Sequence, residues 1–146
     1  MIVLGWREWV ALPGLGLAAV RAKVDTGARS SALHCDALEA FQRDGAEWVR
    51  FRLQTGEPGA VAAAEARVID RRPVTDSGGH TTERVFIRTP LRLAGVAFEA
   101  ELNLANRRNM LFPMLLGRTA LAGRFLVDPA ASLLHGDPPG GGAPSP

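Results

Sequence analysis

The tripeptide Asp25-Thr26-Gly27 is the part of this sequence best suited to acid–base chemistry. Two carboxylates held about 3 Å apart share one proton, so that one activates water while the other protonates a peptide carbonyl. In such a site Thr26 would brace the loop through its hydroxyl, and Gly27 would permit backbone geometry that is closed to residues with a Cβ. The tripeptide alone is a weak signal, because an ordinary turn after a strand can contain it, and the chain has one copy.

A second motif lies about ninety residues later, where Leu115 and Leu116 precede Gly117. The two leucines predict a buried strand, and residues 118–122 predict a helical turn, with Gly117 at the junction. A glycine at this point would let the backbone pack closely against the loop that contains Asp25. We therefore expect Leu116 and Gly117 to support that loop.

Between the two motifs, residues 67–88 predict a β-hairpin. A mobile, glycine-rich hairpin can close over a bound peptide, exclude water and grip the peptide backbone. The order of loop, hairpin and glycine strand favours a peptidase-like fold over a chance Asp-Thr-Gly. The turn of the hairpin is predicted at Ser77, Gly78, Gly79 and His80.

These motifs resemble the bacterial retropepsin-like aspartic peptidase family, which is also labelled "ATP-dependent zinc protease". The resemblance implies a retropepsin-like closed β barrel, the acid protease fold, with a flap hairpin and one short helix. It also implies an endopeptidase in which Asp25, Thr26 and Gly27 form the catalytic loop. Some members are associated with ligases that add glutamates to a ribosomal protein, which implies trimming of such tails. The similarity spans roughly residues 5 to 135 and is carried by residues 5–10, 23–34, 84, 106–107 and 110–118.

The zinc and ATP of that label find no support in the residues. The chain has three histidines and one cysteine, with neither a His-Glu-x-x-His nor a Cys-x-x-Cys spacing. His34 and Cys35 are adjacent, and adjacent residues rarely serve one tetrahedral metal site. A Gly-x-x-x-x-Gly-Lys-Ser/Thr loop for ATP is also missing. We expect no metal and no other cofactor, and we interpret Cys35 as a packing residue.

The composition predicts one compact domain. A chain of 146 residues suffices for one hydrophobic core but is too short for two ordinary domains. We expect the peptidase domain to span residues 1–136, and the Pro- and Gly-rich residues 137–146 to form a disordered tail. A single cysteine excludes an intrachain disulfide framework. The sequence has neither a signal-peptide pattern nor an apolar run of membrane-spanning length, so we expect a cytoplasmic protein without membrane contact.

Short alternating patterns predict an all-β chain, because many brief strands separated by turn residues are typical of closed barrels. Residues 36–41 are instead predicted to form a short helix or turn, and residues 132–134 a final edge strand. The other predicted strands are residues 3–12, 17–24, 48–53, 61–69, 83–88, 96–104 and 124–127.

The basic residues suggest an acidic peptide substrate. The net charge is only +2, and Lys23 is the sole lysine among 17 basic residues. Residues two apart on a strand share a face, so we expect Lys23 to point toward the same cleft as Asp25. Guanidinium groups would add paired hydrogen bonds to substrate carboxylates. Two alternatives to substrate binding stay open. The excess of arginine can reflect genome composition, and Lys23 and Arg118 can form structural ion pairs with Asp or Glu. The predicted substrate contacts are Lys23, Arg29, Arg84, Arg107 and Arg118, with Ser77, Gly78, Gly79 and His80 from the hairpin turn.

The sequence leaves alternatives open for the partners and for the activity of the protein. A nucleic-acid partner is disfavoured, because the basic residues are scattered among acids and no familiar binding motif is present. One Asp25 per chain makes a dyad only if two chains meet about a two-fold axis. We therefore expect either a homodimer that supplies the second Asp25 or a monomer with another catalytic arrangement. A catalytically silent peptide-binding module on the same barrel is the main alternative to an endopeptidase.

Overall fold

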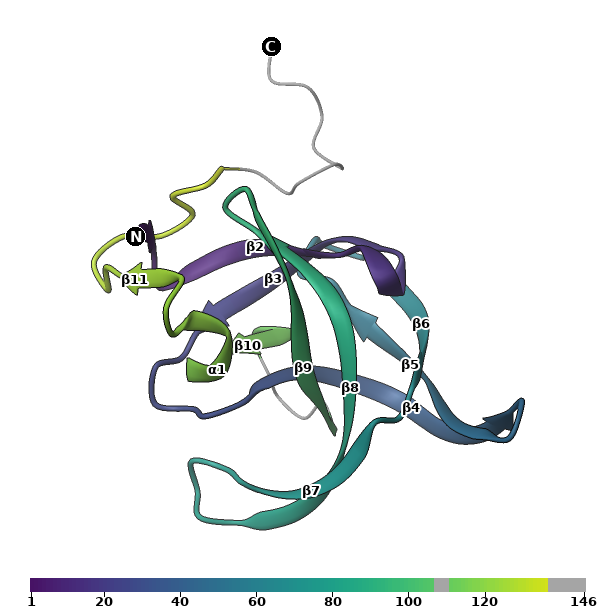
Figure 1. Ribbon diagram of the computed structural model, residues 1–146. Helices are drawn as coiled ribbons and strands as arrows, with labels where there is room; N and C mark the ends of the chain where they lie inside the picture. Colours follow the sequence, from purple (N-terminus) through teal and green to yellow (C-terminus); the bar gives the residue numbers. More distant parts are fainter. Residues whose placement is uncertain (107–110, 137–146) are drawn as a thin grey trace.

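The computed structural model describes residues 1–106 and 111–136, and β-strands dominate it (Figure 1). The predicted all-β barrel with a hairpin flap and one short helix is confirmed. The elements are β1 (Ile2–Leu4), β2 (Arg7–Leu12), the 3₁₀ turn η1 (Pro13–Leu15), β3 (Leu17–Val24), β4 (Ser31–Arg43), β5 (Ala46–Gln54), β6 (Val61–Arg67), β7 (Asp70–Thr75), β8 (Thr81–Leu93), β9 (Val96–Asn106), β10 (Met114–Leu116), α1 (Arg118–Leu121) and β11 (Phe125–Val127).

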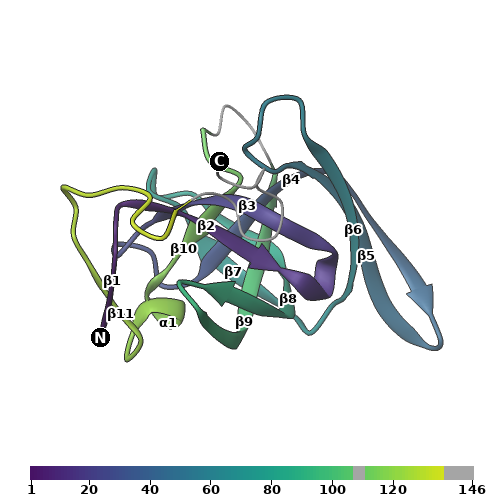
Figure 2. The same ribbon diagram turned by 90° about the horizontal axis from the view of Figure 1, so that it is seen from above.

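The barrel is a ring of six strands. They follow the order β10-β3-β2-β8-β9-β4, and β10 also pairs with β4, which closes the ring. β5 and β6 continue the sheet from β4 as an arm that extends away from the end carrying α1, β1 and β11 (Figure 2). β7 pairs with β8 outside the ring and forms the flap with it.

Alternating side chains explain why these segments form strands. In β5, Val49, Phe51 and Leu53 are buried, while the residues between them are exposed. The same alternation runs along β8 from Ile87 to Leu93. Fully burying one such aliphatic or aromatic side chain contributes about 2 kcal/mol, so the two-residue period fixes which face turns inward. Side chains that fill the ring include Leu12, Val20, Leu33, Ile87, Leu102, Met114 and Leu116.

Two of the predicted elements are wrong. Residues 36–41 form neither a helix nor a turn but belong to β4, which pairs with β5. The register shifts between Asp36 and Glu39, and Ala37 has φ +52°, so a bulge interrupts the alternation that identifies a strand. Residues 132–134 form no strand: Leu133 also has a positive φ, its N–H donates to Arg7 O, and its carbonyl accepts the N–H of Gly136 in a turn.

Residues 128–136 form a C-terminal strap that crosses the start of the chain. The carboxylate of Glu8 is fully buried and accepts backbone N–H groups from Gly5 at 2.7 Å, Leu134 at 3.1 Å and His135 at 3.3 Å. A Cβ at Gly5 would lie 2.5 Å from Ala131 O, so only glycine allows this close approach. One buried carboxylate therefore fastens the end of the described chain to its beginning.

The barrel, the flap and the strap occupy most of the predicted domain. Residues 1–136 form the barrel, flap and strap, apart from residues 107–110, which are not described. The predicted disordered tail, residues 137–146, lies outside the described residues. Within those residues, α1 is only a four-residue helix, and no helix has the length and apolar character needed to cross a membrane.

Candidate active site

Asp25 follows the last residue of β3, where the chain leaves the ring. Its backbone N–H donates to Leu116 O at 2.9 Å, which ties the loop to β10. Its Oδ1 accepts the N–H of Gly27 at 3.0 Å, and its carbonyl accepts the N–H of Ala28 at 3.2 Å. Oδ2 accepts no hydrogen bond from the described residues. The loop thus holds a half-buried carboxylate with one oxygen available to water.

The loop after Asp25 rests directly on the Gly117 turn. Gly117 N–H donates to Ser31 Oγ at 3.0 Å, and a Cβ at Gly117 would lie only 2.5 Å from Ser30 O. The next two backbone N–H groups donate to the carbonyls of Ala28 and Arg29 at 2.8 and 3.0 Å. Leu116 is fully buried beside Val24. The structure therefore brings together the two motifs that the sequence singles out.

Thr26 takes part through its backbone. Its carbonyl accepts Arg118 Nη1 at 3.1 Å, which connects the loop to the start of α1. Its hydroxyl makes no hydrogen bond within the part of the chain that the structure describes, so bracing through the hydroxyl stays a prediction.

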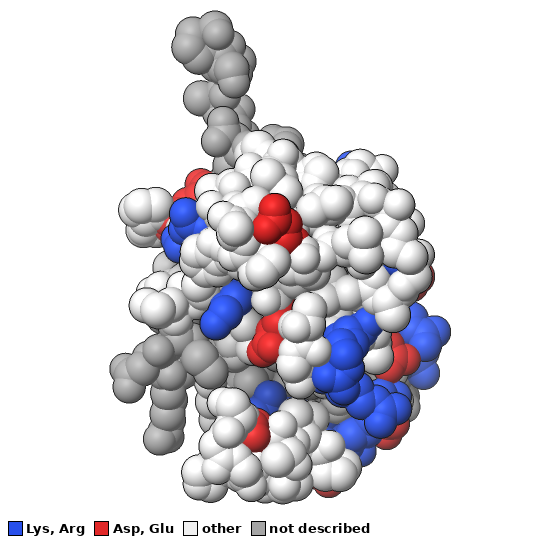
Figure 3. All heavy atoms as spheres, turned by 90° about the vertical axis from the view of Figure 1, so that its left-hand side faces the viewer, with Lys and Arg blue, Asp and Glu red and all other residues white. Residues whose placement is uncertain are grey.

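A cleft of about 1190 Å³ opens beside this loop. The loop, the flap, β9 and α1 form its walls, and Asp25 is among its lining residues. Figure 3 faces this end of the molecule and shows basic side chains gathered on one half of the face, with acidic ones among them. A second hollow of about 560 Å³ lies over β4–β6 and contains none of the predicted site residues.

Four arginines of the cleft have no carboxylate partner among the described residues. Arg84 Nη1 donates to the side-chain oxygen of Asn103, Arg118 donates to Thr26 O, and Arg124 donates to Ala120 O. Arg29 is exposed at the edge of the loop. None of these four guanidinium groups forms an ion pair within the described residues, and a bound anion would be attracted to them.

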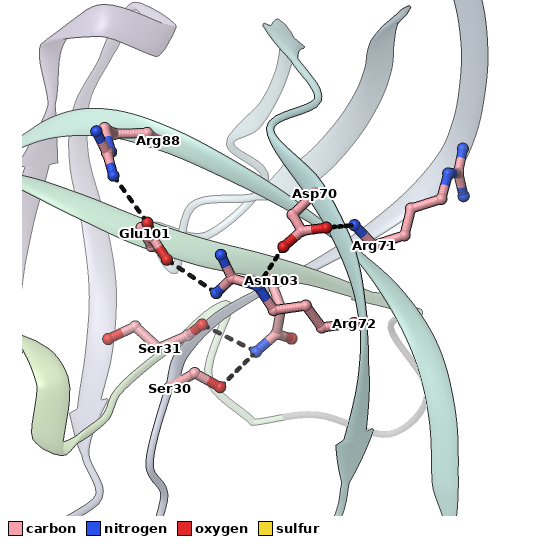
Figure 4. Close-up of polar contacts among 8 residues, drawn as sticks. All are labelled: Ser30, Ser31, Asp70, Arg71, Arg72, Arg88, Glu101 and Asn103. Atoms are coloured by element: carbon pink, nitrogen blue, oxygen red, sulfur yellow. Dashed lines mark hydrogen bonds and ion pairs between the residues drawn. The ribbon is translucent and has the colours of Figure 1, made fainter.

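Two other cleft arginines are neutralised, as Figure 4 shows. Arg72 Nη1 and Arg88 Nη2 donate to the two oxygens of Glu101, each at 2.9 Å. Arg72 Nε also donates to Asp70 at 2.7 Å. Hydrogen bonds from Arg88 and then Arg72 hold the pKa of Glu101 below its ordinary value, and the bond from Arg72 does the same for Asp70. This group fastens β7 of the flap to the barrel wall.

The flap turn is shaped by Asp76. Its Oδ1 accepts the backbone N–H groups of Gly78 at 2.9 Å and His80 at 3.0 Å. The bond from His80 N–H is the main reason that the pKa of Asp76 lies below its ordinary value. Asp76 and Ser77 line the cleft, whereas Gly78, Gly79 and His80 form the exposed tip beyond it.

Lys23 is exposed on β3 and does not line the cleft that contains Asp25. The expectation that the two share a cleft is wrong because β3 ends at Val24, so strand alternation does not extend to Asp25. Lys23 makes no ion pair within the described ranges. Arg107, another predicted contact, lies outside the described residues. Arg29, Ser77, Arg84 and Arg118 do line the cleft.

Sequence reasoning missed a row of polar residues on the cleft-facing side of β7, β8 and β9. Strand alternation could have found them, because polar side chains recur at every second position opposite the buried ones. Asn103, the most buried of them, is 1 % exposed. The missed cleft residues that carry hydrogen-bonding or charged groups include Arg72, Arg88, Glu101 and Asn103 on these strands, and Ser30 and Arg124 outside them.

The residues do not fit a metal centre. In residues 1–106 and 111–136, no three His, Cys, Asp or Glu side chains gather closely enough to hold an ion. His34 Nδ1 lies 2.8 Å from Phe112 O, so that nitrogen is engaged with the backbone. Burial raises the pKa of the Cys35 thiol to about 12, which disfavours the thiolate that zinc requires.

Comparisons with known proteins found a family and several relatives. Residues 3–138 match the family described as "Retropepsin-like aspartic endopeptidase RimB". A protein from Desulfotalea psychrophila is 40% identical over 137 residues, and one from Parasynechococcus marenigrum is 43% identical over 138 residues. Both are named "Probable alpha-L-glutamate ligase"; they match 92% and 93% of this chain, which spans only 30% of their length.

A solved structure shares the fold. The crystal structure of a Legionella pneumophila protein of unknown function superposes with a TM-score of 0.75 and is 25% identical. The match covers 91% of this chain and 97% of that protein. With the Asp25 loop, the flap and the Gly117 turn arranged around one cleft, the chain belongs to the RimB-like family of retropepsin-like aspartic endopeptidases.

Proposed function

We propose that this chain is an aspartic endopeptidase that hydrolyses acidic, glutamate-rich peptides or tails. One observation carries the proposal: Asp25 shares its cleft with four arginines that have no carboxylate partner among the described residues. A neutral peptide would leave those charges uncompensated, whereas substrate carboxylates can accept their hydrogen bonds in pairs.

Hydrolysis in this proposal needs a second carboxylate. A second copy of the chain, related by a two-fold axis, would bring its own Asp25 to the first. The ionised partner would take a proton from water, whose oxygen attacks the peptide carbonyl carbon. The protonated partner would donate to the carbonyl oxygen. The carboxyl that took the water proton would then give it to the amide nitrogen, while the other carboxylate takes back the hydroxyl proton, so that the C–N bond breaks and the amine leaves. The flap would close over the peptide and exclude bulk water.

The names of the relatives support glutamate as the recognised residue. Proteins called probable alpha-L-glutamate ligases contain a region that matches this chain. Glutamate chemistry therefore accompanies the same domain in longer proteins, and a glutamate chain is a chemically consistent substrate for its cleft. The proposal includes a cytoplasmic location, which fractionation of source cells would test.

Cleavage of octaglutamate and of a length-matched glutamine peptide tests the function. We expect cleavage of the acidic peptide with a kcat/KM at least about tenfold higher. Asp25→Asn should abolish cleavage while leaving the melting temperature within a few degrees. Equal rates on both peptides would refute the acidic preference, and equal activity of wild type and Asp25→Asn would refute the aspartic mechanism. Sedimentation with and without peptide would show whether the active form is a dimer.

A peptide-binding module without catalysis is the second candidate. The 1190 Å³ cleft with its unneutralised arginines would bind acidic peptides whether or not a dyad forms. Calorimetry separates the two cases, because a pure binding module would hold octaglutamate with equal affinity in wild type and Asp25→Asn and would cleave it in neither.

A further inference from the structure

We propose that Asn103 is the positioning residue of this cleft, fixing the acid-binding Arg84 relative to the loop that contains Asp25. The inference rests on the proposed function, since it takes Arg84 as a contact for substrate carboxylates. Arg84 belongs to β8 of the flap, and Asn103 belongs to β9 of the barrel. No motif in the sequence draws attention to Asn103.

One carboxamide makes both connections. Asn103 Oδ1 accepts Arg84 Nη1 at 3.0 Å. Asn103 Nδ2 donates to Ser30 Oγ at 3.1 Å and to Ser31 O at 3.0 Å, as Figure 4 shows for the two serines. Ser31 Oγ in turn accepts the N–H of Gly117. A continuous chain of hydrogen bonds therefore runs from a flap arginine to the turn beneath the catalytic loop.

The chemistry at each end selects an asparagine. A guanidinium only donates hydrogen bonds and a backbone carbonyl only accepts them, so the linking side chain must accept on one side and donate on the other. Aspartate would place a carboxylate oxygen against Ser31 O and would neutralise Arg84. Leucine has a similar volume but makes neither bond. Because Asn103 is 1 % exposed, water cannot readily replace the lost partners.

A mutant cycle tests the coupling with octaglutamate as the probe. The variants are Arg84→Gln, Asn103→Leu and the double substitution. Arg92→Gln is the matched control for Arg84, because Arg92 is an exposed residue of the same strand that does not line the cleft. Asn106→Leu, at the exposed end of β9, is the control for Asn103. KM and kcat are measured, and the amide resonances of Gly27 and Gly117 are followed by NMR.

The expected results differ between the two residues. Arg84→Gln should raise KM about tenfold and change kcat little, because it removes a charged contact with bound substrate. Asn103→Leu should raise KM by a similar factor, lower kcat about tenfold and shift both glycine resonances, because the loop loses its support. The KM of the double variant should then exceed the KM of Asn103→Leu alone by no more than about twofold.

Several outcomes would overturn the inference. If Arg84→Gln raises KM by the same factor in the wild type and in Asn103→Leu, Asn103 does not hold Arg84. If Asn103→Leu fails to fold, Asn103→Asp replaces it. This variant should lower kcat for both peptides and raise KM for octaglutamate only, and any other pattern refutes the inference.

Failure of the proposed peptidase function is distinguishable from failure of this inference. If the wild type does not cleave octaglutamate, the peptidase proposal fails, and the same cycle is measured through dissociation constants and glycine resonances. Non-additive dissociation constants would then support the role of Asn103, and additive ones would overturn it. Failure of the wild type to bind octaglutamate at all would overturn it too.

Discussion

Arg72 and Glu101 are joined across an intervening strand: Arg72 Nη1 on β7 donates to Glu101 Oε1 on β9 at 2.9 Å, while β8 lies between the two strands. β7 has no strand partner except β8 in the described chain. Its position over the cleft therefore depends on the β8 ladder and on side-chain contacts such as this one. The same Glu101 also accepts Arg88, so one carboxylate anchors two guanidinium groups.

Removing this anchor should loosen the flap. We expect Arg72→Gln to speed hydrogen exchange at the Asp76–His80 turn by about two- to fivefold, which corresponds to the roughly 1 kcal/mol or less of a partly exposed ion pair. Exchange in the ring strands should not change. Arg67→Gln is the control, because Arg67 is exposed on β6 and makes no ion pair within the described residues. Equal exchange in wild type and Arg72→Gln would show that the anchor does not restrain the flap.

The contribution of Glu101 to stability should depend on pH. Its pKa in the folded protein lies below the ordinary 4.5, so ionised Glu101 stabilises the fold above that pH, and the contribution disappears as the pH falls through the lowered pKa. We expect Glu101→Gln to lower stability by up to about 1 kcal/mol at pH 7 and by less in 1 M salt. Thermal melts of both proteins from pH 7 down to pH 2 check this. A difference in stability between wild type and Glu101→Gln that grows as the pH falls would contradict it.

Glu8 should contribute more to the stability of the fold than any surface ion pair does. Glu8→Ala leaves three backbone N–H groups of Gly5, Leu134 and His135 without their acceptor and opens a cavity, so we expect a loss of about 3 kcal/mol. Limited proteolysis should then cut within residues 128–136 before the barrel. Glu39→Ala, on the exposed half of β4, is a control with little expected effect. A melting temperature close to wild type would refute this role.

Gly117→Ala should displace the loop that contains Asp25. The new Cβ would overlap Ser30 O, a backbone atom that can move only with the loop, and overpacking of this kind costs about 1–3 kcal/mol. Gly16→Ala has open space but a φ of +71°, so it should lower stability through backbone strain alone. We expect the Gly27 amide resonance to shift in Gly117→Ala and to stay in place in Gly16→Ala. An unmoved resonance in both would refute the support assigned to Gly117.

Cys35 should resist alkylation. Burial is the main cause that raises the pKa of its thiol to about 12, and the charge of Asp36 adds to it, so almost no thiolate forms at pH 8. We expect iodoacetamide to modify the folded protein at least about a hundredfold more slowly than the urea-unfolded protein. Rapid modification of the folded protein, followed by mass spectrometry, would contradict this burial.

Local motifs were readable from the sequence because their chemistry is local. Asp25-Thr26-Gly27, the Gly117 turn and the glycine-rich flap each depend on neighbouring residues, and the structure brings all three to one cleft. Strand alternation places Glu101 and Asn103 on one face of β9, but their bonds to Arg72, Arg84 and Ser30 depend on segments far apart in the chain, which a single sequence does not specify. Residues 36–41 were not predicted as part of β4, because the bulge at Ala37 interrupts the strand alternation and because pairing with β5 overrides the local helix preference.

The buried carboxylate of Glu8 also keeps the two ends of residues 1–136 close together. β1 pairs with β11, and the strap returns from β11 to the residues that follow β1, so the chain enters and leaves the domain through one small region. A domain with that entrance can be joined to further sequence at either side without opening its barrel or its cleft. In the curated relatives, the region that matches this chain is joined to more sequence, because it makes up 30% of a longer protein.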